Sequence, residues 1–90
     1  MTLKEFIDAY EESNNEQVTM NFLLFERKND KDVCTEDIII FSKDDSSYVE
    51  EKYMKREVLS FKLFNISKEI DPVTNIEITY IVMVVVLKEN

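Results

Sequence analysis

The apolar residues at the start of this chain follow the spacing of a helix. They recur at intervals of three and four residues and would form one stripe, made of Leu3, Phe6, Ile7 and Tyr10. Thr2 precedes the stripe and Glu5 follows Thr2 by three residues, which is the capping-box pattern of a helix start. We therefore predict a helix from residue 2 to about residue 13.

From residue 17 onward the pattern changes to a period of two, which is typical of strands. We predict four strands, covering residues 17–27, about 33–42, 58–66 and 76–88. The first two would form an antiparallel hairpin around the turn residues 29–32, and residues 67–75 would be a loop. Ser47 and Glu50 form a second capping pattern, which predicts a short helix over residues 48–54.

The last predicted strand is apolar on both faces. One face holds Val82, Val84 and Val86, and the other holds Met83, Val85 and Leu87. A strand of this kind is normally central in its sheet and covered on both sides. The N-terminal helix would cover one side, and either the short second helix or a partner protein would cover the other.

Together these elements predict one α+β domain over residues 1–90. Its N-terminal helix would pack on a mainly antiparallel sheet of about four strands, with a short second helix before the third strand. The chain is 44% hydrophobic and 33% charged, which is typical of a globular domain with one modest core.

The chain carries no signal for export or membrane insertion. Its start becomes acidic at once, and its longest apolar run, residues 80–87, is far shorter than the roughly 20 residues of a membrane helix. The single cysteine, Cys34, excludes an intrachain disulfide, and we expect it half-buried near the start of a strand. We therefore expect a cytoplasmic protein of a bacterial host cell that does not bind membranes.

The composition also argues against an enzyme. The chain has no histidine, the commonest general base and metal ligand, and no glycine for a phosphate-binding loop. We therefore predict no catalytic residues, no cofactor and no metal. Asp44 and Asp45 with Ser46 leave a metal-dependent enzyme as a weaker alternative, but a solvated turn explains them better.

Negative charge is concentrated in the first part of the chain. Residues 1–51 hold 14 acids and 5 bases, whereas residues 52–90 hold 5 acids and 6 bases. Such an imbalance favours a negative field on one face and a positively charged partner. Selection for solubility alone would explain it as well.

The candidate partner-binding residues are therefore acids and tyrosines of the first 53 positions. They are Asp30, Asp32, Glu36, Asp37, Asp44, Asp45, Tyr48, Glu50, Glu51 and Tyr53. Carboxylates would engage lysine or arginine of the partner, and tyrosine is enriched at interfaces. For Tyr48 and Tyr53 the alternative is that they dock the short helix on the sheet.

Two segments, residues 1–7 and 55–61, resemble small acidic proteins of bacteriophages and other mobile elements of low-GC Gram-positive bacteria. The resemblance implies a class that includes anti-CRISPR proteins and other inhibitors that mimic nucleic acid. The expected function is thus a non-enzymatic inhibitor that blocks the basic surface of a nucleic-acid-processing protein, such as a CRISPR effector or a nuclease, without binding nucleic acid itself. The alternative is a self-associating structural protein, in which a second copy covers the last strand.

Overall fold

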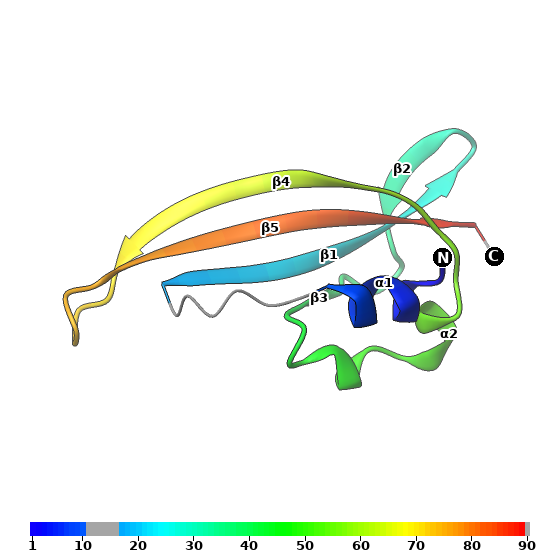
Figure 1. Ribbon diagram of the computed structural model, residues 1–90. Helices are drawn as coiled ribbons and strands as arrows, with labels where there is room; N and C mark the ends of the chain where they lie inside the picture. Colours follow the sequence, from blue (N-terminus) through cyan, green and yellow to red (C-terminus); the bar gives the residue numbers. More distant parts are fainter. Residues whose placement is uncertain (11–16, 90) are drawn as a thin grey trace.

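The computed structural model describes residues 1–10 and 17–89, which form an α+β fold around one curled mixed sheet (Figure 1). In chain order the elements are α1 (Leu3–Ala9), β1 (Val18–Lys28), β2 (Lys31–Cys34), β3 (Ile40–Phe41), the 3-10 helix η1 (Ser46–Tyr48), α2 (Glu51–Met54), β4 (Val58–Ile70) and β5 (Glu77–Lys88). The predicted α+β class is confirmed.

The strands lie in the order β2-β1-β5-β4, and β3 also pairs with β1. β5 is central, as its two apolar faces predicted. The prediction of a mainly antiparallel sheet is correct only in part, because β1 and β5 are parallel while the other pairs are antiparallel. After β1 the chain passes through β2, β3 and α2, and it begins β4 at the end of the sheet where β1 finishes. β4 therefore runs in the direction opposite to β1, and β5 runs parallel to β1.

The predicted capping box forms at the start of α1. The Thr2 hydroxyl accepts a hydrogen bond from the Glu5 amide at 3.2 Å, and the Glu5 carboxylate accepts one from the Thr2 amide at 2.9 Å. These bonds satisfy two amides that have no partner within the helix. The helix ends at Ala9, because Tyr10 takes an extended conformation. The predicted continuation beyond residue 10 lies outside the described residues.

The hairpin of β1 and β2 is confirmed, but the predicted strand over residues 33–42 is wrong. Two short strands, β2 and β3, replace it, and residues 35–39 between them are irregular. The hydroxyl of Thr35, a buried residue, donates to the Asp37 carbonyl, and such local bonds compete with strand pairing. Cys34 ends β2 and is exposed, not half-buried as predicted.

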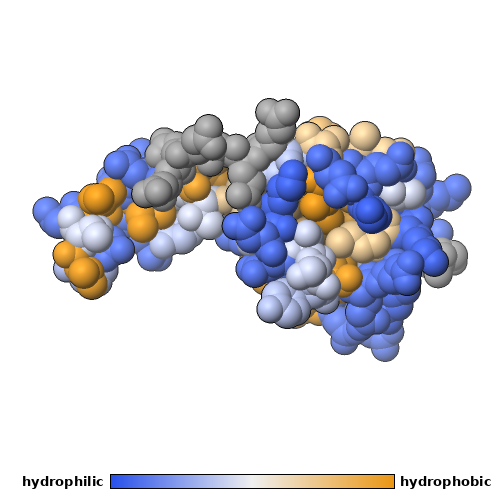
Figure 2. Space-filling view, turned by 60° about the horizontal axis from the view of Figure 1, so that its bottom comes forward, coloured by the Kyte–Doolittle hydropathy of each residue, from blue (hydrophilic) through white to orange (hydrophobic). Residues whose placement is uncertain are grey.

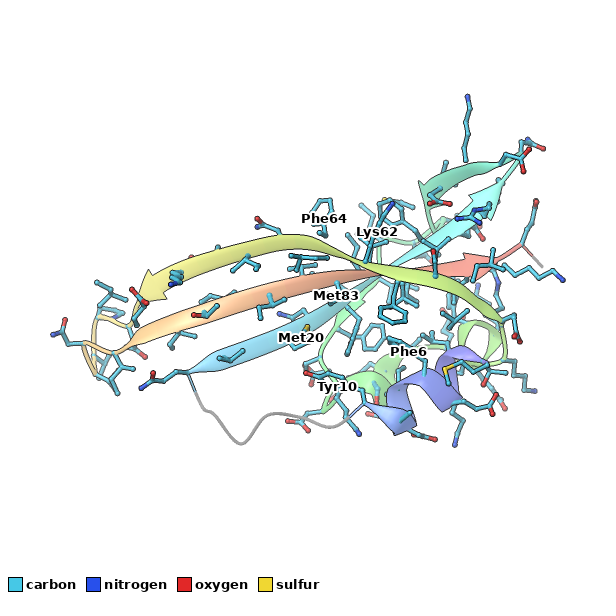
Figure 3. All side chains as sticks on the ribbon, turned by 45° about the horizontal axis from the view of Figure 1, so that its top comes forward. Phe6, Tyr10, Met20, Lys62, Phe64 and Met83 are labelled. Atoms are coloured by element: carbon cyan, nitrogen blue, oxygen red, sulfur yellow. The ribbon has the colours of Figure 1, made fainter. Side chains whose placement is uncertain are left out.

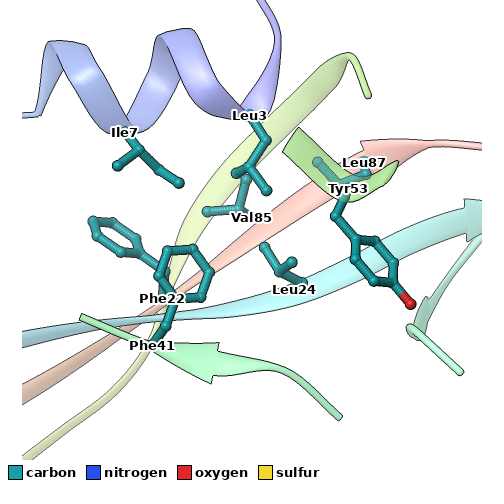
Figure 4. Packing of buried hydrophobic residues seen from close by; sticks show 8 residues of the cluster. All are labelled: Leu3, Ile7, Phe22, Leu24, Phe41, Tyr53, Val85 and Leu87. Carbon is teal, nitrogen blue, oxygen red and sulfur yellow. The ribbon is translucent and has the colours of Figure 1, made fainter. Parts of the chain in front are cut away.

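The core lies on one face of the sheet, under both helices (Figure 4). Its buried cluster comprises Leu3, Ile7, Phe22, Leu24, Phe41, Tyr53, Val85 and Leu87. α1 contributes Leu3 and Ile7, and α2 contributes Tyr53, so the two helices share this face. α2 therefore does not cover the second apolar face of β5, which was one of the two predicted arrangements. The second predicted capping box is also wrong, since Glu50, the N-cap of α2, makes no side-chain capping bond.

β4 is longer than predicted. It continues through Ile70, and residues 67–69, which were predicted as loop, pair with residues 80–78 of β5. The hairpin of β4 and β5 therefore extends well past the helices (Figure 1) and gives the molecule extents of 45 × 24 × 19 Å. Figure 2 shows apolar side chains on the surface of this projecting arm. We refer to the half of the hairpin beyond the helices as the distal arm.

Candidate protein-interaction surface

β4 is an edge strand with an unusual number of exposed apolar side chains. It is the last strand of the sheet, and no strand pairs with its outer side in the part of the chain that the structure describes. Its large exposed apolar residues are Leu59, Phe61, Leu63, Phe64, Ile66 and Ile70. Phe64 is 62% exposed and Ile70 is 64% exposed. We call the outer side of β4 with these six side chains the β4 edge.

Most edge strands are protected against association with other chains. Short length, charged residues, proline or a covering segment normally block the free N–H and C=O groups. β4 is 13 residues long, and its charged residues are Lys62, Lys68 and Glu69. A long apolar edge of this kind is a binding surface for a further strand or a site of aggregation.

A β-bulge divides the β4 edge into two segments. Leu63 pairs with Met83 and Asn65 with Val82, so that Phe64 is the extra residue. On the face that carries the helices, β4 presents Phe61, Leu63, Ile66 and Ile70, which lie opposite odd-numbered residues of β5. Figure 3 shows Phe64 and Lys62 on the other side, pointing away from the helices. We call these two sides the helix face and the open face.

On the helix face, an apolar groove lies where α1 meets the distal arm. Its volume is about 400 Å³, and its lining includes Phe6, Tyr10, Met20, Phe61 and Met83 (Figure 3). The ring of Phe6 lies 5.3 Å from that of Phe61, centroid to centroid. The groove therefore continues the apolar surface of β4 toward the buried core.

The charges beside the β4 edge are largely paired. Lys62 lies 3.7 Å from a carboxylate oxygen of Asp32, which also accepts a hydrogen bond from Arg27 at 2.9 Å. The bond from Arg27 lowers the pKa of Asp32. Lys68 lies 3.8 Å from Glu77. The edge itself is thus close to neutral, although the whole chain carries a net charge of −8.

More acids of the first part of the chain are paired with a base than the sequence suggests. Four bases of residues 52–90 pair with acids of residues 1–51, in the pairs Arg56–Glu26, Lys62–Asp32, Lys52–Glu50 and Lys55–Glu51. The pairs Arg56–Glu26 and Lys62–Asp32 join positions 30 apart, so the sequence alone could not reveal them. They reduce the negative field that the predicted binding face would produce.

The remaining predicted residues are exposed, with the exception of Tyr53, and all of the exposed ones except Tyr48, which ends η1, lie on turns or loops. Asp30, Glu36, Asp37, Asp44, Asp45 and Tyr48 are exposed, and Tyr48 is 85% exposed. Tyr53 instead belongs to the core cluster, so it docks α2 on the sheet. Glu36 lines a polar hollow of about 190 Å³ together with Lys52 and Arg56. Asp45 accepts a hydrogen bond from Ser42 at 3.1 Å.

Within residues 1–10 and 17–89, no three acidic or cysteine side chains come together as candidate metal ligands. None of the helices that the structure describes has the length and apolar character needed to cross a membrane.

Comparisons with protein families, with curated proteins and with solved structures found no match.

The β4 edge was not predicted from the sequence as an exposed apolar surface. Alternation shows which residues share a face, but it does not show whether that face is covered. One signal was present: the two-sided apolar pattern of β5 needs cover on both faces, and the chain has one substantial helix. The exposed apolar surface lies on β4, however, whereas Val84 and Val86 of β5 are buried.

Proposed function

We propose that this protein is a non-enzymatic protein-binding protein and that the β4 edge is its main contact surface. The observation that carries the proposal is the edge strand of 13 residues with six large exposed apolar side chains. A strand added to this edge would satisfy the free backbone groups, and its side chains would cover the apolar residues on both faces.

The proposal can be tested by purification from the native host. We would express a tagged copy beside an untagged copy, with the tagged copy as wild type, as Ile66→Lys or as Val73→Lys. The protein chains that are retained with the tagged copy would then be identified. Loss of a chain with Ile66→Lys, but not with Val73→Lys, supports binding at the β4 edge. Val73 is a suitable control because it is equally apolar and 89% exposed but lies outside the strands. Retained chains that are identical for all three forms would contradict the proposal.

A second candidate function is an inhibitor that docks an acidic surface on a basic nucleic-acid-processing protein. Specific support comes from Glu36, Asp37, Asp44 and Asp45, which are exposed and take part in none of the ion pairs formed within the described residues. Opposite charges would speed the encounter at low salt.

Salt dependence separates the two candidates. Reversal of Glu36, Asp37, Asp44 and Asp45 to lysine should weaken an electrostatic complex strongly at low salt and much less at high salt. A partner held by the β4 edge should instead persist through a salt gradient, because apolar contacts are not screened. Binding that survives the four reversals unchanged at low salt would exclude the acidic inhibitor.

A further inference from the structure

We propose that the strand bound at the β4 edge is the β4 strand of a second copy of this chain. The two strands would run antiparallel about a two-fold axis and join two sheets into one. This inference rests on the proposed function, because it names the partner of the same surface.

The charge of the molecule restricts where two copies can meet. A net charge of −8 opposes association in general, because like charges repel. The β4 strand itself holds two lysines and one glutamate, and Lys62 and Lys68 are close to Asp32 and Glu77. A second copy that approaches along this strand therefore avoids the repulsion that acidic loops would cause.

The bulge at Phe64 makes one self-pairing register complementary. If the two-fold axis passes through Ile66, which then faces Ile66 of the second copy, Lys62 lies opposite Glu69 of the second copy, and Phe61 lies opposite Ile70 of the second copy. Residues opposite one another in an antiparallel pair must point to the same face. In a regular strand Lys62 and Glu69, seven positions apart, would point to opposite faces.

The observed register with β5 removes this conflict. Lys62 lies opposite Val84 and Glu69 opposite Ile78, and both partners are even-numbered residues on the open face. Phe61 lies opposite Val85 and Ile70 opposite Glu77, and both partners are odd-numbered residues on the helix face. Because of the extra residue in the bulge, the two residues of each pair point to the same face. The dimer would contain two Lys62–Glu69 pairs and two Phe61–Ile70 pairs.

This arrangement also covers the distal arm. Antiparallel pairing places the distal arm of each copy beside the helical layer of the other. Ile70 of the second copy would then lie beside Phe61, whose ring contacts Phe6 at the apolar groove. The side chains that the arm exposes in one copy thereby extend the core of the other.

Oligomeric state and covalent trapping test the inference. Light scattering of the purified full chain over a wide concentration range should give the mass of a dimer, and Ile66→Lys should give a monomer. In a Cys34→Ser background, the double variant Lys62→Cys and Glu69→Cys should form disulfide-linked dimers under oxidation. Lys62→Cys with Lys68→Cys is the matched control, since residues 62 and 68 lie on different faces and should not link.

Charge reversal provides a second readout that does not depend on cysteine. Glu69→Lys should weaken the dimer about tenfold, because two cross-strand ion pairs are lost and like charges take their place. Asp37→Lys, which makes the same charge change in the exposed segment after β2, the strand at the opposite edge of the sheet, should change the dimer little. Circular dichroism would confirm that both variants fold.

A wild-type chain that stays monomeric at every concentration would overturn this inference. The proposed function would then still be decided by the purification experiment, in which a different chain would be lost with Ile66→Lys. A dimer that links through the control cysteines but not through positions 62 and 69 would also overturn the register.

Discussion

The Arg56 guanidinium donates a hydrogen bond from Nη1 to a carboxylate oxygen of Glu26 at 2.9 Å, and both side chains are about nine-tenths buried. The same guanidinium donates from Nε to the carbonyl of Lys88 at 3.0 Å. Arg56 lies two residues after the end of α2, Glu26 lies on β1, and Lys88 ends β5. This single side chain therefore ties three elements together at the end of the sheet opposite the distal arm.

Glu26→Gln should lower the free energy of unfolding by about 3 kcal/mol, because removal of one member of a buried ion pair leaves the other without compensation. We expect the lower part of the usual range, since Arg56 keeps its bonds to Lys88. Urea unfolding followed by circular dichroism measures the change. Glu50→Gln is the control, because the pair of Glu50 with Lys52 is exposed and should contribute little. Equal effects of the two variants would contradict the role of the Arg56–Glu26 pair.

The same pair predicts how stability depends on pH. Burial raises the pKa of Glu26, but the hydrogen bonds from Arg56 and Lys28 outweigh burial, and the net pKa lies below the ordinary value of 4.5. The stabilisation is therefore complete above about pH 4.5 and is lost as the pH falls through the pKa of the folded state. The difference in unfolding free energy between wild type and Glu26→Gln should narrow as the pH falls from 5 toward 3. A difference that stays constant over this range would refute the assignment.

Much of the fold follows from local patterns, and its deviations have physical causes. The capping box of Thr2 and Glu5 forms as predicted because both partners lie within four residues. β5 is central because its two faces are apolar. The parallel pairing of β1 with β5 was not predictable, since alternation is the same for either strand direction. The full length of β4 was missed because Ser67, Lys68 and Glu69 lie at exposed edge positions where polar residues are tolerated.

The candidate surface was harder to predict than the fold. The acids of the first half were identified correctly as a cluster in sequence, but their compensation by Arg56 and Lys62 depends on contacts between distant positions. The face to which Phe64 points depends on a bulge, and the sequence around residue 64 contains no glycine or proline to mark one. The pairing of the acids and the bulge can be recognised only when the neighbouring elements in the fold are known.

The turn between β1 and β2 offers a stabilising substitution. Asn29 and Asp30 have φ angles of 52° and 63°, a conformation that costs energy for residues with a Cβ atom. Asp30→Gly creates the Asn-Gly sequence that two-residue hairpin turns favour, and should raise the free energy of unfolding by about 0.5–1 kcal/mol. Thermal unfolding measures the shift. Asp30→Val, whose branched side chain disfavours this conformation, should lower the melting temperature, and an increase would contradict the turn geometry.

The apolar residues of β1 and β4 should differ sharply in their effect on stability. Leu24 is completely buried in the core cluster, so Leu24→Ala should cost about 2–5 kcal/mol of unfolding free energy. Leu63 is 54% exposed, so Leu63→Ala should cost well under half as much in the monomer. Urea unfolding at low protein concentration, where a dimer is dissociated, makes the comparison. If Leu63→Ala at low concentration proved as damaging as Leu24→Ala, Leu63 would be a core residue and the β4 edge would not be free to bind another chain.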